Sequence, residues 1–196
     1  MIDHPLPTGA TPLNADDAKG LLPAGVRTRG QLDEFEFSNI QVAMPWAFRA
    51  RHPMEIVSVE FSQELHRRMF DKTWAWAGSF RRYEVNIGMT PPHQVPMRMR
   101  DLCEDATLWV QQKVFPEAEL CIRFHHRMVW IHPFPNGNGR HSRIMADVLA
   151  KSLGLPRFRW GRALLSAPGA GRAEYIAALQ AADSHNIEPL LAFAMS

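Results

Sequence analysis

Apolar residues recur every three to four positions along most of the chain, which is the period of a helix with one buried face. The pattern predicts helices over residues 30–50, 58–70, 97–114, 116–131, 139–153, 172–182 and 187–195. In the fourth of these helices Leu120, Phe124 and Met128 lie on one stripe. Pro116 begins its first turn, where a missing N–H costs no hydrogen bond. The sequence is therefore expected to fold as an all-α helical bundle.

Residues 80–96 do not follow the helical period. The stretch FRRYEVNIG alternates and contains Tyr83, Val85 and Ile87, which are residue types that favour strands. The stretch GMTPPHQVP that follows contains the residues of a turn. We therefore predict a small β-hairpin flap over residues 80–96.

The first 28 residues contain many Pro, Gly and Asp residues, which are typical of extended chain. They are predicted to form a lead-in with one short helix near residues 15–20. A chain of 196 residues, of which 46% are hydrophobic, is long enough for one domain with an ordinary core. We expect that domain to occupy residues 29–196.

Charge is unevenly distributed along the chain. The formal net charge is only +2, from 22 basic and 20 acidic residues, so the molecule as a whole is not a polyanion binder. Between Cys121 and Arg162, however, eight cations stand against the single acid Asp147, a local charge of +7. A field of this sign suits the phosphate groups of a nucleotide or a nucleic acid.

The two cysteines, Cys103 and Cys121, lie within apolar helical patterns, so buried thiols in a reducing compartment are expected. No N-terminal run resembles a signal peptide, and no apolar run reaches the roughly 18 residues of a membrane span. We predict a cytoplasmic protein with no membrane partner.

The stretch IHPFPNGNGRHSR, residues 131–143, joins two predicted helices. Pro133 and Pro135 fix φ and stiffen it, whereas Gly137 and Gly139 permit positive φ and close backbone approach. Asn138 can cap the helix that follows. The free N–H groups of such a loop, together with the helix dipole, are expected to form an anion site.

Charged and titratable side chains flank this loop. Arg140 and Arg143 stand three residues apart and so share a helix face, where each guanidinium can fork onto phosphate oxygens. His132 has a pKa suited to taking a proton from a hydroxyl near pH 7. The residue types fit phosphate-ester chemistry with a general base. The alternative is an ordinary turn between helices with a core histidine, and the residues alone leave both interpretations open.

The twelve residues from His132 to Arg143 resemble the signature of Fic-domain proteins, His-x-Phe-x-Asp/Glu-Gly-Asn-Gly-Arg-x-x-Arg. Every defining position matches except one. The stretches NIQVAMPW, LHRRMFDKTWAWAGSFRRYEVNIG, RFHHRMVWIHPFPNGNGRHSRIMADVLA and YIAALQAADSHNIEPLLAF look like the Fic subfamily called mobile mystery protein B. The resemblance covers residues 9–193 and implies a Fic-type helical bundle.

The resemblance also implies an activity. Such proteins are adenylyltransferases that move AMP from ATP to a Ser, Thr or Tyr hydroxyl of a target protein. By motif position His132 would be the catalytic base and Phe134 a core anchor. The resemblance assigns phosphate and ATP binding to Gly137, Asn138, Gly139, Arg140 and Arg143. It assigns docking of the target segment, by strand addition, to the flap residues Arg82, Tyr83, Val85, Asn86 and Ile87.

The one departure from the signature is Asn136, where the family usually has Asp or Glu holding Mg²⁺ (or Mn²⁺) between the phosphates. An amide oxygen can ligate such an ion but adds no charge to attract it. A kinase-like or other-nucleotide transferase therefore stays open beside AMP transfer. So does a weakly active module that binds nucleotide or nucleic acid, although nucleic acid is the less favoured partner.

Two further expectations concern control and support of the site. An inhibitory Ser/Thr-x-x-x-Glu-Gly/Asn motif is matched only in part by Ser184 and Glu188, because Pro189 follows. Restraint of a toxin-like activity is therefore expected from a partner antitoxin or from a weak site. His125 and His126 point apart on their helix, so we expect one or the other to support the loop through hydrogen bonds and expect no His-ligated metal.

Overall fold

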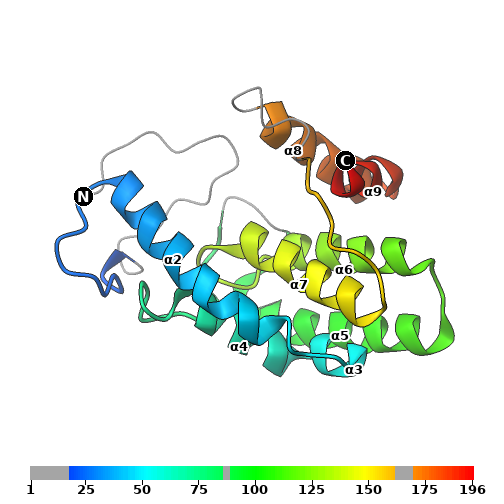
Figure 1. Ribbon diagram of the computed structural model, residues 1–196, viewed down its shortest axis with the longest axis horizontal. Helices are drawn as coiled ribbons and strands as arrows, with labels where there is room; N and C mark the ends of the chain where they lie inside the picture. Colours follow the sequence, from blue (N-terminus) through cyan, green and yellow to red (C-terminus); the bar gives the residue numbers. More distant parts are fainter. Residues whose placement is uncertain (1–17, 86–88, 162–169) are drawn as a thin grey trace.

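A computed structural model describes residues 18–85, 89–161 and 170–196 of the chain. Its helices are labelled in Figure 1. They are α2 (Arg29–Ala47), α3 (Pro53–Ile56), α4 (Val59–Phe70), η1 (Pro92–Gln94), α5 (Val95–Gln112), α6 (Glu117–Ile131), α7 (Asn138–Ser152), α8 (Ala170–Asp183) and α9 (Glu188–Met195). The all-α prediction is confirmed, and each of the seven helices listed from the sequence is present with ends shifted by a few residues. The short helices α3 and η1 were not predicted.

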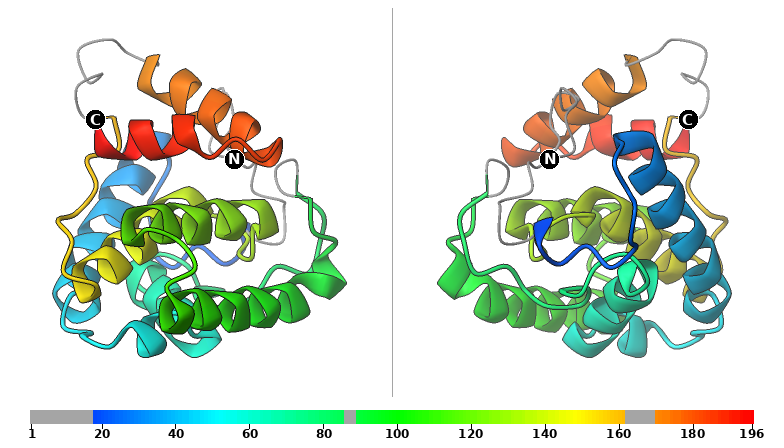
Figure 2. Two further views of the ribbon diagram at one scale, coloured as in Figure 1. Left: turned by 90° about the vertical axis from the view of Figure 1, so that its right-hand side faces the viewer. Right: turned by 90° about the vertical axis from the view of Figure 1, so that its left-hand side faces the viewer.

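The helices stack in layers, as Figure 2 shows, with α6 between α5 on one side and the α8–α9 pair on the other. Helix α7 packs along α6, and α2 packs along α4. The inner surfaces bury Leu65, Met99, Phe124 and Met145, whose side chains are fully buried. Burying a side chain of this size contributes roughly 1.5–3 kcal/mol. The motif loop joins α6 to α7, two helices that pack along each other beside this core.

Helix α2 begins where the lead-in was expected to end. The Thr28 hydroxyl accepts a hydrogen bond from the Gln31 N–H, and the Gln31 side chain accepts one from the Thr28 N–H. This reciprocal pair satisfies two N–H groups that the first turn leaves without helical partners. Of the short helix expected at residues 15–20, all but residues 18–20 lie outside the described residues.

The predicted β-hairpin is wrong for the described part of residues 80–96. Residues 80–85 form no strand, and from Pro92 the chain is already helical. Pro91, Pro92 and Pro96 each remove an N–H that a hairpin ladder needs. The Tyr83 and Thr90 carbonyls are bonded to the Arg81 guanidinium and not to an opposing strand. Asn86 and Ile87 of the expected flap lie outside the described residues.

The two cysteines are as the sequence predicted. Cys103 and Cys121 are free, buried thiols. Burial raises the pKa of Cys103 to about 12 and raises that of Cys121 further, so neither is a thiolate near neutral pH. Among the described residues, no helix combines the length and the apolar character that a bilayer crossing requires.

Candidate active site

The loop 132–137 begins with a left-handed residue. Helix α6 ends at Ile131, and His132 follows at φ 51° and ψ 62°, with its N–H bonded to the Met128 carbonyl at 3.0 Å. A non-glycine residue in this region costs roughly 1–2 kcal/mol, so surrounding contacts must hold it there. The left-handed turn directs the chain out of α6 and sets the direction of the His132 ring.

Asn138 closes the loop from the other side. Its amide oxygen accepts the Phe134 N–H at 2.9 Å, and its amide nitrogen donates to the Phe134 carbonyl at 2.8 Å. The side chain of Asn138 thus clamps the loop across four residues. The sequence suggested that it would cap α7, and the structure shows that it does not. The cap position of α7 belongs to Gly137.

Gly137 is the glycine that the loop requires. Its φ is +77°, and a Cβ built there would lie 2.5 Å from Cζ of Phe70. Gly139 is different, because it lies inside α7 and a Cβ there would meet nothing within 4 Å. The sequence interpretation gave both glycines the same backbone role, and the structure corrects it for Gly139.

The two glycines provide a matched pair of variants. Gly137→Ala should lower the free energy of unfolding by about 2–4 kcal/mol, because it adds left-handed strain to a clash with the Phe70 ring. Gly139→Ala should be neutral or slightly stabilising, since alanine is the better helix former. Urea unfolding of both variants measures the difference. Equal stability of the two would mean that the Gly137 turn is not as tight as described.

Buried rings lie directly under the loop. Phe134 is fully buried, as expected of a core anchor, and stacks on His66 of α4 with ring centroids 3.8 Å apart. His66 Nε2 lies 3.0 Å from the Asn136 carbonyl, and its Nδ1 accepts the Gly78 N–H at 3.0 Å. Both ring nitrogens are therefore satisfied in one neutral tautomer. Burial holds the pKa of His66 well below its usual value, and the nearby His141 acts in the same direction.

Sequence reasoning missed His66. The available signal was its place beside Leu65 and before Met69 on the buried face of the 58–70 helix. A polar residue on such a face needs buried hydrogen-bond partners. The position of those partners, in segments 12 and 70 residues away, is a tertiary fact that no local pattern carries.

His132 is 6% exposed, and burial lowers its pKa to about 4, with the Arg81 charge acting in the same direction. Its Nδ1 lies 3.4 Å from the Val129 carbonyl. A carbonyl can only accept, so this contact places the proton on Nδ1 and the lone pair on Nε2. His132 is therefore a neutral base at pH 7, although a weaker one than the sequence suggested.

The two motif arginines are held by different elements. Arg140 Nη1 lies 2.7 Å from Oε2 of Glu36, a carboxylate of α2 that is 2% exposed and also accepts the Trp74 indole N–H at 2.7 Å. The Arg140 guanidinium lies 5.1 Å from the centroid of the Phe70 ring. Among the described residues, the Arg140 guanidinium hydrogen-bonds only to Glu36, so its remaining N–H groups can turn to a phosphate. Glu36 was not identified from the sequence, where it reads as one of several acids on a helix.

Arg143 faces α8. Its Nε donates to the Gly139 carbonyl at 3.0 Å, and its guanidinium lies 5.4 Å from the Tyr175 ring centroid. The Tyr175 hydroxyl is 3.1 Å from His125 Nε2. His126 contacts Asp183 at 2.8 Å. These two histidines therefore bond to α8 and not to the loop, which corrects the expectation from sequence.

Asn136 is half-buried, and its amide oxygen accepts the Gly137 N–H at 2.6 Å. A carbonyl oxygen has a second lone pair, so it can still approach a cation. Within the described ranges, no three His, Cys, Asp or Glu residues gather as a metal site. The donor set fits a hard cation carried by nucleotide phosphates better than one held mainly by the protein.

The expected target-docking residues are described only in part. Arg82 is exposed, and Tyr83 and Val85 are half-buried, on non-helical chain beside the loop. The Tyr83 hydroxyl is buried, and no described residue hydrogen-bonds to it. Trp74 is a core residue and is 1% exposed.

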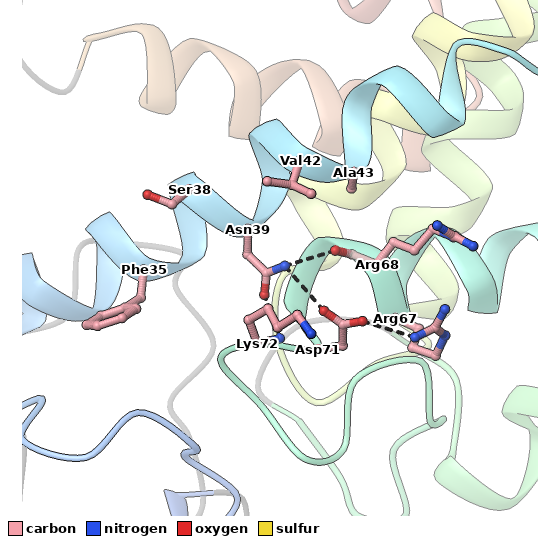
Figure 3. Close-up of a pocket in the computed structure, with 9 residues that line it drawn as sticks. All are labelled: Phe35, Ser38, Asn39, Val42, Ala43, Arg67, Arg68, Asp71 and Lys72. Carbon is pink, nitrogen blue, oxygen red and sulfur yellow. Dashed lines mark hydrogen bonds and ion pairs between the residues drawn. The ribbon is translucent and has the colours of Figure 1, made fainter.

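A separate groove lies between α2 and α4, shown in Figure 3. Its volume is about 410 Å³, and no residue of the 132–143 motif lines it. Asn39 forms part of its floor and bonds to the Arg68 carbonyl, while Asp71 bonds to Arg67 at 3.0 Å. The cations that line this groove are thus largely neutralised by neighbouring acids.

Comparison with known proteins identifies related chains. Residues 56–150 match the family described as Fic/DOC. Protein adenylyltransferase fic-1 of Caenorhabditis elegans is 26% identical over 144 residues, which cover 70% of this chain and 26% of the relative. Protein adenylyltransferase Fic of Aedes aegypti is 30% identical over 107 residues, which cover 52% of this chain and 21% of the relative. The chain thus spans about a quarter of the length of these curated relatives.

Solved structures share the fold. A Fic domain containing signaling protein from Bacteroides thetaiotaomicron has a TM-score of 0.70 at 19% identity, covering 83% of this chain and 68% of that one. BepC from Bartonella tribocorum, solved with bound AMPPNP, has a TM-score of 0.67 at 17% identity, covering 93% of this chain and 97% of that one. At these identities the likeness concerns the arrangement of helices.

Proposed function

We propose, from the premise that residues 56–150 form a Fic/DOC domain, that this protein is an adenylyltransferase. It would move AMP from ATP to a Ser, Thr or Tyr hydroxyl of a target protein. One observation carries the proposal: a buried neutral histidine, His132, stands at the entrance of a glycine turn that leads into a helix carrying two arginines. Relatives named as protein adenylyltransferases support it.

The chemistry assigns each group one task. His132 Nε2 takes the proton of the target hydroxyl, whose oxygen forms a bond to the α-phosphorus of ATP. The bond from that phosphorus to the bridging oxygen breaks, and pyrophosphate leaves. Arg140 and Arg143 hold the β- and γ-phosphates. The N–H groups of Asn138 and Gly139 hold an oxygen of the phosphate chain, and that of Gly137 joins them when it exchanges the Asn136 amide oxygen for the phosphate.

A cation completes the scheme. Mg²⁺ or Mn²⁺, if bound together with the nucleotide, would supply positive charge that offsets the charge of the leaving pyrophosphate. Asn136 is the residue proposed to hold it, through one neutral amide oxygen that accepts the Gly137 N–H in this structure. The binding of the ion therefore depends mainly on the nucleotide.

The target is proposed to dock on the segment after Phe80. Residues 80–85 are non-helical and lie next to the loop, because the Arg81 N–H donates to the Pro133 carbonyl at 2.9 Å. Arg82, Tyr83 and Val85 of this segment, with Asn86 and Ile87, are the proposed contacts. An extended target segment could add to such a backbone by main-chain hydrogen bonds.

The test supplies ATP labelled at the α-phosphate or at the γ-phosphate to purified protein in a bacterial lysate with Mg²⁺ or Mn²⁺. Label from the α-position on a protein band is the expected result. Label from the γ-position would make the protein a kinase. Neither label, with other labelled nucleotides also silent, would overturn the transferase proposal in favour of a nucleotide-binding or nucleic-acid-binding module, whose affinity should fall steeply with salt.

Asn136 gives this proposal its second candidate, a transferase with a weakened cation site. Asn136→Asp should lower the Mg²⁺ concentration needed for half-maximal transfer by roughly 10-fold, because a carboxylate adds a full charge for a hard ion. Asn136→Ser, which keeps a neutral oxygen, serves as the control. An unchanged Mg²⁺ titration for the Asp variant would show that position 136 does not approach the ion.

Finer assignments rest on the resemblance of the sequence. We place the chain in the mobile mystery protein B subfamily and expect a toxin-like activity restrained by an antitoxin. The free, buried thiols of Cys103 and Cys121 suit a reducing compartment, which supports a cytoplasmic location.

A further inference from the structure

Arg81 is a buried cation at the start of the proposed docking segment. Arg81 is 2% exposed, and no ion pair joins its side chain to a described acid. Burial lowers the pKa of Arg81 from its usual value, but an arginine guanidinium stays charged at neutral pH. A buried charge without a counter-ion must be compensated by hydrogen bonds.

Those bonds all go to backbone carbonyls. Nε donates to the His132 carbonyl at 2.6 Å, and Nη2 donates to the Ile131 carbonyl at 3.2 Å. Nη1 donates to the Tyr83 carbonyl at 2.9 Å, and Nη2 also donates to that of Thr90. One guanidinium therefore joins the end of α6 to both ends of the 83–90 segment.

The contacts with α6 bear on the catalytic base. The carbonyls of Ile131 and His132 lie at the C-terminus of α6, where the helix leaves them without helical partners and where a positive charge is favoured. His132 holds a left-handed conformation that costs energy. The Arg81 bond to its carbonyl fixes the peptide plane after His132, and so restrains the direction of its ring.

The contacts with Tyr83 and Thr90 bear on the docking segment. Because both carbonyls share the guanidinium that holds His132, a movement of this segment must change the bonds around His132 or break one of them. A second tie runs in parallel, since the Met89 N–H donates to the Trp130 carbonyl at 3.1 Å. The phosphate-binding loop depends on other contacts, those of Asn138 and His66.

We propose that Arg81 is a positioning residue that couples the docking segment to the orientation of His132. The proposal rests on the proposed function, because it treats His132 as the base. Under this proposal Arg81 raises the rate of AMP transfer and does not affect the affinity for ATP.

The test is Arg81→Lys, assayed for incorporation of α-label from ATP into lysate protein. An ammonium keeps the charge but cannot fork across four carbonyls. The apparent kcat, normalised to molecules that bind nucleotide, should fall at least about 10-fold, while the KM for ATP should stay within about 2-fold. Arg98→Lys is the control, because Arg98 is an exposed α5 residue whose ion-pair partner among the described residues is Asp101.

Two results would overturn the proposal. An unchanged normalised kcat would show that Arg81 does not position the base, and a matching rise in the KM for ATP would show general damage to the loop. If Arg81→Lys does not fold, Met89→Pro removes the parallel tie at an exposed residue and should lower kcat without changing the KM for ATP. An unchanged kcat there would contradict the coupling.

A measurement without turnover separates this proposal from the proposed function. The ring ¹⁵N signals of His132, recorded by NMR at pH 7, should shift in Arg81→Lys and stay unchanged in Arg98→Lys. If the wild-type protein transferred no nucleotide, the proposed function would fail. The His132 ring signals would still test whether Arg81 orients that ring. Identical His132 signals in Arg81→Lys and wild type would overturn it.

Discussion

Replacing His132 with Ala should reduce transfer of AMP by roughly 10²–10⁴-fold, because a general base contributes about that much to a proton transfer. ATP binding should change little, since the phosphate contacts belong to α7 and to the turn before it. Incorporation of α-label measures the rate, and calorimetric titration with a non-hydrolysable ATP analogue measures the binding.

The left-handed backbone at His132 calls for a second variant. Alanine is strained at positive φ, whereas asparagine tolerates it. His132→Asn should therefore lose transfer to the same extent while keeping more stability. His52→Ala, at an exposed residue that makes no capping hydrogen bond, is the matched control. Transfer at the wild-type rate in both position-132 variants would rule out the base assignment.

The free energy of unfolding should fall as the pH is lowered from 7.5 to 5.5. Four histidines are buried in the described structure: His66, His125, His132 and His141. Burial lowers the pKa of His125 to about 3 and those of His132 and His141 to about 4, and it holds that of His66 well below its usual value. All four are therefore neutral in the folded protein throughout this range.

The sign follows from where the protons bind. In the unfolded chain each histidine has a pKa near 6.5, so below that value the unfolded state binds more protons than the folded state. Stability is then fully present above pH 6.5 and is lost toward the folded pKa values. One unit below 6.5, each histidine removes about 1.4 kcal/mol, or about 5–6 kcal/mol for the four together. That is a large part of the 5–15 kcal/mol typical of a domain.

Urea unfolding at the two pH values measures this effect. His141→Gln removes one titrating group and should reduce the pH dependence by about a quarter, whatever it does to the stability itself. Asp147 has a raised pKa because of its burial, which acts in the opposite sense, since its protonation favours the folded state as the pH falls. Equal urea midpoints at pH 7.5 and 5.5 would contradict the burial of these rings as neutral groups.

The sequence by itself determined the helices and the chemistry of the motif. Apolar periodicity gave the ends of α4, α6 and α7 to within two residues, because that signal is local and repeats within each turn. The residues from His132 to Arg143 indicated phosphate chemistry because their types and spacing carry the signal without any partner. The left-handed turn at Gly137 was likewise indicated by residue type.

Only the tertiary structure decided what each of these residues contacts. Glu36 reaches Arg140 across 104 positions, and His66 reaches Asn136 across 70, so neither pair leaves a local pattern. The hairpin was predicted because β-favouring residues are also the residues of extended, half-buried chain. In residues 80–90 the Tyr83 and Thr90 carbonyls accept hydrogen bonds from Arg81, and these bonds take the place of a hairpin ladder. A buried cation takes its acceptors wherever the fold places carbonyls, and that placement is a property of the packed helices.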